Sequence, residues 1–476
     1  MSDSLITYPP KNTKWNNVAF SISFYVCIAI SFSVSCYCIF SSTPDYSIIK
    51  THITTLPGIP MVKVIPLVVV CAFVFSLLFI YLIKVMTRLF IILFGVVFPV
   101  IFSVILIVLS ILSFSRGIWT FVTLLVCGVS LLISPLIIFV SRKKLPITID
   151  IVHLSSTALI QTKHILFVLC PLLLIVTTTV LLFVPGSVVL NYLSGTTKND
   201  QYVPPKAFIP ILLLQAFSLF WVLNTVSGVS VVITSSVISH KYLNTKDVGD
   251  SFMESVYNAL TKKFGSIAFG SLILSVVQFI QFVVNYLDGD DDDPSVAQRI
   301  LKCIFQYLLS LLETIVRYVN KMAYVIVGMH GTPFLESAHV AVDLVKNNLV
   351  TAILQDTVIG SICFGVILVG GIMCGSIGGV FVYVFGYGKV VSYITFIVSF
   401  IISIFVVSYF FALLQASTDT ILLCYAEDLV LFNGVHCEKL NAIVSHYDKY
   451  EPFEAINTEQ NDSQVVPQEH HNEQNF

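Results

Sequence analysis

Apolar runs that carry no charged residue repeat along the whole chain. The clear runs are residues 18–40, 64–83, 89–112, 118–140, 165–190, 208–237, 264–287, 357–387 and 390–414. A helix of about 20 apolar residues crosses the hydrocarbon core of a bilayer. Lipid is therefore the solvent of most of this chain, and the sequence predicts an all-α, polytopic transmembrane helix bundle.

The composition excludes an ordinary soluble protein. Of the 476 residues, 56% are hydrophobic and 11% are charged, whereas soluble domains carry about 25% charged residues. The formal net charge is −2, so there is no basic surface of the kind that binds nucleic acid. Membrane lipids are the expected surroundings, and nucleic acid is not an expected partner.

Residues 296–356 differ from the clear runs because charges alternate with apolar residues at helical spacing. Arg299, Lys302, Glu313, Arg317 and Lys321 interrupt an otherwise apolar helical face. Such amphipathic helices either lie in the membrane interface or cross the bilayer shielded by neighbouring helices. We take a segment at about 301–329 as a further crossing, which gives about ten spans.

Lysine and arginine in short loops orient the protein. They follow the second, fourth and sixth runs, at Lys84, Arg142 and Lys262 among others. These loops share one side, which we assign to the cytosol. The prediction is a cytosolic segment 1–16, a transmembrane domain 17–415 and a cytosolic tail 416–476, in the plasma membrane or, alternatively, an internal membrane.

None of the nine clear runs contains Asp, Glu, Lys, Arg or His. Catalysis inside the bilayer would need such groups, so an enzyme is disfavoured, and neither a cofactor nor a metal site is expected. Asp419, Glu427 and Asp428 lie near Cys424 beyond the last run. We interpret these acids as a solvated helix end.

The run 264–287 carries a polar stripe. Its members are Ser271, Ser275, Gln278, Gln281 and Asn285, and their spacing places them on one helical face. Carboxamides facing lipid would lack hydrogen-bond partners. The stripe therefore either holds helices together or lines a solute path.

The run 208–237 carries a tryptophan near its middle. Trp221 has Phe217, Phe220 and Asn224 as helical neighbours. A mid-helix tryptophan usually packs in the core. The alternative is an aromatic pocket, since a quaternary ammonium binds aromatic faces by cation–π attraction.

Glycines are frequent in the run 357–387. Gly371, Gly375 and Gly379 form two overlapping G-x-x-x-G steps, which let another helix approach closely. Tight packing and a hinge for alternating access are the two interpretations.

A series of short motifs resembles the choline transporter-like family, particularly its fungal branch. The motifs are Phe264–Ser271, Arg317–Tyr324, Gly331–Phe334, Ser337–Ala338, Asp356–Gly360, Ser417–Thr420 and Cys424–Asp428. The resemblance implies about ten spans, cytosolic termini and transport of choline or a related amine or lipid precursor.

The first functional hypothesis is a transporter or facilitator that moves a small solute, choline or a related amine, between the sixth, seventh and ninth spans. The second is a non-transporting membrane protein that organises lipids or partner proteins through residues 296–321 and 334–354. A channel is a third hypothesis, although no ring of charged side chains indicates a selectivity filter.

Overall fold

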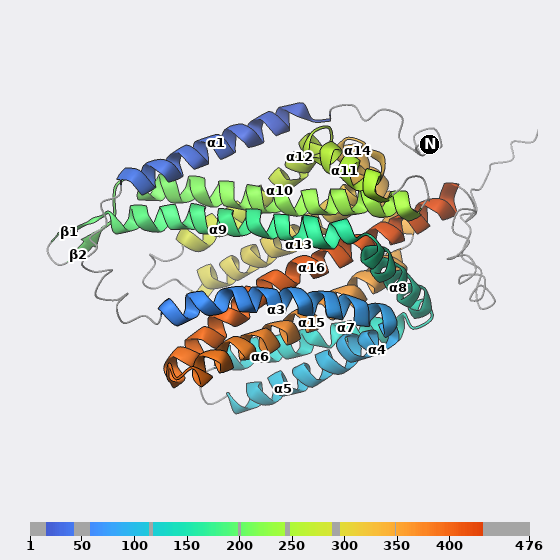
Figure 1. Cartoon of the computed structure of the whole chain (residues 1–476), viewed down its shortest axis with the longest axis horizontal. Helices are drawn as coiled ribbons and strands as arrows, with labels where there is room; N and C mark the ends of the chain where they lie inside the picture. Colours follow the sequence, from blue (N-terminus) through green and yellow to red (C-terminus); the bar gives the residue numbers. More distant parts are fainter. Residues whose placement is uncertain are drawn as a thin grey trace, which may run out of the picture.

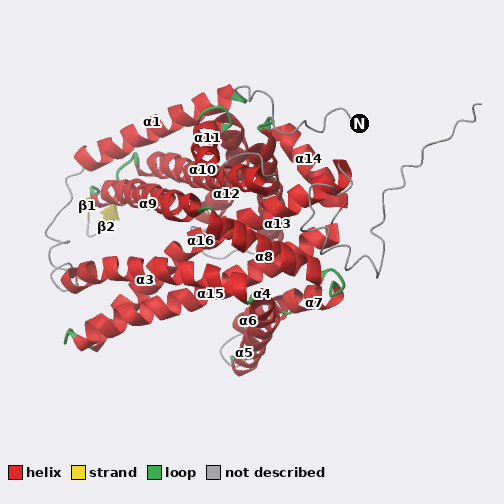
Figure 2. Cartoon of the chain, turned by 45° about the vertical axis from the view of Figure 1, so that its right-hand side comes forward, coloured by secondary structure: helices red, strands yellow, loops and turns green. Residues whose placement is uncertain are grey.

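The computed structural model describes residues 16–41, 58–113, 118–198, 201–242, 248–287, 296–347 and 349–431. These residues form a bundle of long helices (Figures 1 and 2), which confirms the predicted all-α polytopic architecture. One two-stranded hairpin joins α9 to α10, with Thr197 of β1 opposite Tyr202 of β2. Within the described part of the chain, nine helices are long and apolar enough to cross a membrane.

The first half of the bundle contains two short π-helical segments, η1 and η3, that continue directly into α-helices. Its elements are α1 (Val18–Ser41), α3 (Gly58–Val85), α4 (Thr87–Ile92), η1 (Leu93–Val97), α5 (Phe98–Leu112), α6 (Ile118–Leu131), α7 (Ile133–Val140), α8 (Leu145–Gln161), η3 (Ile165–Leu169) and α9 (Cys170–Leu193). Proline stands at the start of α5, α8 and α9. In α8, which follows a turn, the missing N–H of the proline has no intrahelical partner to lose.

The second half begins with the hairpin strands β1 (Thr196–Lys198) and β2 (Gln201–Val203). Its helices are α10 (Phe208–Tyr242), α11 (Val248–Leu260), α12 (Phe264–Leu287), α13 (Val296–His330), α14 (Phe334–Asn347), α15 (Leu349–Val384) and α16 (Lys389–Leu431). Glycines with positive φ, Gly386 and Gly388, form the turn between α15 and α16. Only this turn separates the two helices, so they pack as an antiparallel pair.

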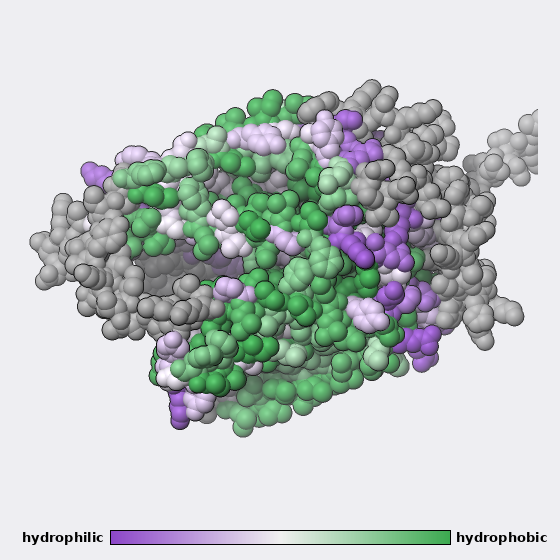
Figure 3. Space-filling model, in the orientation of Figure 1, coloured by the Kyte–Doolittle hydropathy of each residue, from purple (hydrophilic) through white to green (hydrophobic). Residues whose placement is uncertain are grey.

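Two groups of helices lie on either side of α16. In Figures 1 and 2, α1, α9, α10 and α12 form one group, and α3 to α7 with α15 form the other. The last helix packs against α10 and α9 of the first group and against α15 and α3 of the second. Apolar side chains cover the outside of both groups (Figure 3), as expected where lipid is the solvent.

Hydroxyls inside the bundle are mostly satisfied by their own helices. Ser155 donates to the carbonyl of Ile151, and Thr87 donates to that of Ile83. These bonds to the preceding turn let serine and threonine occur in apolar helices without partners from other elements.

Helix α13 packs along α10 and α12 over its inner half. Its 35 residues correspond to about 50 Å of helix, more than the hydrocarbon thickness. Its charges keep it outside the nine apolar candidates. The crossing at about 301–329 stays a prediction, for which the length of α13 is sufficient.

The interpretation of Asp419, Glu427 and Asp428 as a solvated helix end is wrong. All three are buried, because α16 continues to Leu431 with α8, α13 and α14 packed around it. Glu427 Oε1 lies 3.0 Å from His330 Nε2 of α13. The boundary at residue 415 between transmembrane domain and tail therefore falls inside a helix.

Candidate solute-binding site

The inner half of the α12 polar stripe, Ser271 and Ser275, is packed and fully buried. The hydroxyls of Ser271 and Tyr324 of α13 are 2.9 Å apart, and Asn224 Nδ2 of α10 donates to Ser275 Oγ at 2.9 Å. This half of the stripe holds α10, α12 and α13 together.

The outer half of the stripe is more open and meets charged groups. Gln278 and Gln281 are half-buried, and Asn285 is exposed. Gln278 Oε1 accepts from Asn224 Nδ2 at 2.8 Å, while Gln278 Nε2 donates to Glu313 Oε1 at 2.9 Å. Glu313 also pairs with Arg317 one turn further along α13. The network is therefore continuous from α10 across α12 to the charged face of α13.

Trp221 is part of the packed interior, with 4% of its surface exposed. Its Nε1–H, the single donor of the side chain, bonds the carbonyl of Ala268 at 3.1 Å. Its ring packs against Phe24 and Phe217, at centroid distances of 5.3 and 5.8 Å. Phe220 contacts Phe282 of α12 instead. Through these contacts Trp221, Phe217 and Phe220 pack α10 against α1 and α12.

The three helices expected around the path do not surround one space. Among the described residues, α10 and α12 pack together, while α15 packs chiefly against α16 and α3 and shares no substantial interface with either. Helix α13 takes the third place beside α10 and α12. The segment that sequence reasoning left ambiguous thus lies at the centre of the polar network.

Lys321 of α13 lies between two carboxylates from two other helices. Its Nζ is 2.6 Å from Asp356 Oδ1 of α15 and 3.1 Å from Asp419 Oδ2 of α16. The side chain of Asp419 is 1% exposed and that of Asp356 is 39% exposed. With all three groups ionised, this ion triad carries a net charge of −1, and its exposed carboxylate is Asp356.

Sequence reasoning missed the triad because of where the apolar runs were cut. The predicted ninth span begins at residue 357, directly after Asp356, and the tenth span ends at residue 414, before Asp419. The signal that was available is that Lys321, Asp356 and Asp419 each lie inside one of the motifs that resemble the family. The pairing itself depends on tertiary packing.

Asp356 lines a groove of about 620 Å³ between α5, α6, α7 and α15. Four aromatic rings face this aromatic groove, together with several hydroxyls. The aromatic residues are Phe94, Phe98, Phe102 and Phe364, and the hydroxyl residues are Ser130, Ser134, Thr357 and Ser361. The Ser134 and Ser361 hydroxyls are 2.8 Å apart. A carboxylate among aromatic faces is a suitable environment for an organic cation.

The π-helical segment η1 brings one of these rings against α15. Phe94 of η1 occupies the space that a side chain at Gly365 would need, since a Cβ there would lie 2.0 Å from the Phe94 ring. Single π-helical turns within α-helices are common at functional sites. Gly365 is therefore required by the shape of the aromatic groove.

The glycines Gly371, Gly375 and Gly379 face α16. Ideal Cβ atoms at Gly375 and Gly379 would lie 3.1 Å from the Cβ atoms of Phe400 and Phe396. Backbone and side chains of the two helices are already in contact, so the geometry is that of tight packing. Their use as a hinge stays a prediction.

Most of the helix bundle matches a known protein family. A family model described as plasma-membrane choline transporter matches residues 125–430. A CTL-like protein of Dictyostelium discoideum is 30% identical over 227 residues, which are 46% of this chain and 40% of that protein. Choline transporter-like protein 2 of Salmo salar is 24% identical over 279 residues, covering 54% and 39%.

The corresponding protein of Cavia porcellus is 27% identical over 249 residues, covering 48% of this chain and 34% of its own length. In these relatives the matched region is less than half of the whole protein. The family model, in contrast, covers well over half of this chain. This multi-pass membrane protein belongs to the choline transporter-like family.

Proposed function

We propose that this protein is a membrane transporter or facilitator for a small organic cation, choline or a related amine. The observation that carries the proposal is the ion triad, whose net charge of −1 is placed beside the aromatic groove through Asp356. Membership of the choline transporter-like family favours the same substrate class. A cationic solute would neutralise the negative charge that remains because Lys321 is the single cation between two carboxylates.

The groove matches the chemistry of a quaternary ammonium. Such a group has no N–H donor, so it is bound by aromatic faces and by a carboxylate nearby. Phe98 and Phe364 lie with their ring centroids 6.5 Å apart, and Asp356 lines the same groove. A desolvated cation–π contact contributes about 2 kcal/mol. Ser134 and Ser361 offer acceptors to the hydroxyl of choline.

The outer approach of the path is assigned to the polar network of α10, α12 and α13. From Gln278 the network passes to Glu313, and Arg317 and Lys321 follow on α13 at intervals of four residues. Each interval is one helical turn, so the charged face leads to the triad. In this proposal Trp221, Phe217 and Phe220 hold α10 in place beside the path.

The proposal includes the orientation expected from the loop charges. Helix α13 crosses the bilayer as the eighth of ten spans, both termini are cytosolic, and the protein is located in the plasma membrane. The triad then lies in the cytosolic half of the bilayer, since Asp356 is two turns from the start of α15.

Uptake of radiolabelled choline into proteoliposomes tests the proposal. We expect uptake by the wild type above that of empty liposomes, and a loss of about tenfold or more for Asp356→Asn, because one charge–charge interaction in a partly dry site is removed. Asp343→Asn, an exposed acid on α14, is the matched control and keeps full uptake.

A second pair of variants tests the aromatic faces without touching a charge. Phe98→Leu lowers choline uptake, whereas Phe385→Leu, at the exposed end of the α15–α16 turn, leaves it unchanged. Gln278→Leu interrupts the outer network and lowers uptake as well. Equal uptake by all of these variants and the wild type would refute the site.

The alternative function is a protein that organises lipids or partner proteins. The observation that favours it is the apolar face of the outer half of α13, where Ile304, Leu308 and Leu312 are exposed. This alternative predicts no uptake of any amine by the wild type. It also predicts that Arg299→Gln with Lys302→Gln changes association with lipids or partner proteins.

A further inference from the structure

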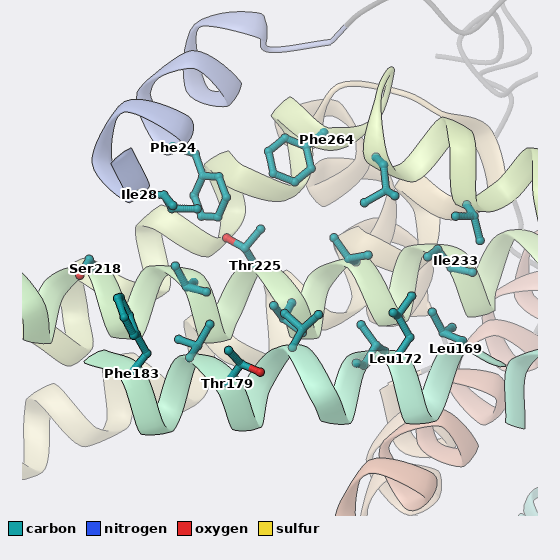
Figure 4. A pocket seen from close by; sticks show the side chains of 18 of the residues that line it. Phe24, Ile28, Leu169, Leu172, Thr179, Phe183, Ser218, Thr225, Ile233 and Phe264 are labelled. Atoms are coloured by element: carbon teal, nitrogen blue, oxygen red, sulfur yellow. The ribbon is translucent and has the colours of Figure 1, made fainter. Parts of the chain in front are cut away.

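A second cavity, of about 700 Å³, lies between α1, α9, α10 and α11, and no residue of the triad lines it. Helix α1 meets α12 at its inner end, where Phe24 and Phe264 are 5.3 Å apart, and meets α9 at its outer end, where Phe32 and Phe183 are 5.4 Å apart. Between these contacts the helices diverge and leave a groove (Figure 4). We call it the acyl groove.

The few hydroxyls of the acyl groove are already used inside the protein. Thr225 donates to the carbonyl of Trp221, and Thr179 donates to that of Ile175. Ser218 and Ser31 bond to each other and to Gln215. All other lining side chains are apolar. A polar solute would find no free donor there, so the occupant has to be a hydrocarbon.

The shape and position of the groove fit one acyl chain. Its lining runs along η3 and α9 from Leu169 to Val184, about 22 Å of helix at 1.5 Å per residue. One leaflet contributes about 15 Å of hydrocarbon, so the groove is long enough to hold an acyl chain of one leaflet. Leu172 and Val176 are exposed on the α9 wall, so the groove opens sideways toward the membrane. A chain from the lipid phase can therefore enter without passing through water.

Two cations lie next to the end of the groove that α11 closes. Lys163 is exposed and precedes His164, whose ring stacks on the groove residue Phe252 at 5.6 Å. Lys262 stands between the groove residues Leu260 and Phe264. Among the acids of α11, Glu254 is exposed and interacts with the buried Lys263. The cations Lys163 and Lys262 at this end favour an anionic headgroup.

We propose that the acyl groove binds an anionic phospholipid from the leaflet on the side of the N-terminus. One acyl chain lies between α1 and α9, and the phosphate is placed at Lys163 and Lys262. The lipid fills the space that α1 leaves open and thereby fixes α1 against α9 and α10. This site is separate from the aromatic groove, so it does not depend on choline transport.

Native mass spectrometry of the full-length protein, released from membranes of known phospholipid composition, tests this inference. We expect retained phosphatidylserine or phosphatidylglycerol on the wild type. Thr179→Trp fills the groove and abolishes the retained lipid. Leu182→Trp is the matched control, because Leu182 lies on the same helix but is 72% exposed and outside the groove; it keeps the lipid.

The charged end is tested separately by titrating phosphatidylserine and phosphatidylcholine onto delipidated protein. Lys163→Gln and Lys262→Gln each weaken phosphatidylserine binding about fivefold and leave phosphatidylcholine binding unchanged, whereas Lys389→Gln, on α16, has no effect. The inference is overturned if Thr179→Trp retains as much lipid as Leu182→Trp. Equal affinity of the wild type for both lipids also overturns it. Unchanged choline uptake in the Thr179→Trp variant would leave the proposed function standing in either case.

Discussion

Lys321 shows how a single buried cation can connect three helices. It bridges Asp356 and Asp419, which come from α15 and α16, whereas its own helix α13 packs chiefly on the other group. The charged residues themselves were visible in the sequence. Their partnership was not, because residues 35 and 98 positions apart in the chain come together only through packing.

Removing the cation of the triad should destabilise the protein strongly. Lys321→Met leaves two carboxylates facing each other without a counter-charge, and we expect the free energy of unfolding to fall by about 3 kcal/mol. Unfolding in mixed micelles measures this change. Adding Asp419→Asn to Lys321→Met should restore part of the loss, and a double variant no more stable than Lys321→Met would contradict the triad.

Lys263 predicts a dependence of stability on pH. The ε-ammonium is buried and donates to the carbonyl of Gly328 at 2.8 Å. Burial lowers the pKa of Lys263 to about 8, although Glu254 nearby raises it. In the unfolded chain the pKa is about 10.4, so the unfolded state binds more protons between these values. Stability should therefore rise with pH across this window.

The variant Lys263→Met should lose this rise, which amounts to at most about 3 kcal/mol. Unfolding curves measured between pH 7.5 and 10.5 for the wild type and the variant give the difference directly. Lys262→Met is the control, because the side chain of Lys262 is only half-buried. This variant should keep the increase of stability with pH that the wild type shows.

At the scale of helices, the periodicity of the sequence predicted which helices form. It was a poorer guide to the contacts that the polar faces of these helices make. The stripe on α12 has the spacing of one helical face. Its members Ser271, Ser275 and Asn285 bond to side chains of α10 or α13. The sequence could not show that Ser271 and Ser275 are buried while Asn285 is exposed. That difference arises because Ser271 and Ser275 bond to Tyr324 and Asn224 within the packed helices, whereas Asn285 bonds to Gln306 near the exposed end of α12.

The glycine face of α15 gives a prediction for this scale. Gly375→Val would place side-chain atoms where Phe400 already lies, and we expect a loss of about 1–3 kcal/mol from overpacking. Gly186→Val on α9 is the matched control, since no atom lies within 4 Å of a Cβ there. Thermal unfolding of both variants in detergent compares them, and equal midpoints would contradict tight packing at Gly375.

For the molecule as a whole, apolar run length was a reliable guide to the fold class. All nine clear runs correspond to helices that can cross a membrane. What the runs could not predict is that α16 would continue past residue 414 and bury its acids, or that α13 would lie among the other helices. Both outcomes depend on charged residues that pair with one another after folding. A sliding-window hydropathy average only falls at each charged residue, so it cannot register such pairing.

The crossing of α13 is a prediction about topology. A glycosylation acceptor with a flexible spacer, inserted within residues 288–295, should be modified in microsomes, whereas the same insert at residues 331–333 should not. A mobility shift that is reversed by endoglycosidase reports modification. The natural acceptor Asn461-Asp462-Ser463 should stay unmodified. Modification of both inserts would show that α13 does not cross.

The close contact between α15 and α16 restricts how this protein can change shape. Glycine-to-aromatic packing from Gly371 to Gly379 brings the two helices into close contact, so we expect it to resist rotation of one helix against the other. Since α16 also touches both helix groups, we expect a rearrangement that exposes the triad to opposite sides of the bilayer to keep α15 and α16 together as a pair. In such a rearrangement, the first group (α1, α9, α10 and α12) would move relative to the α15–α16 pair.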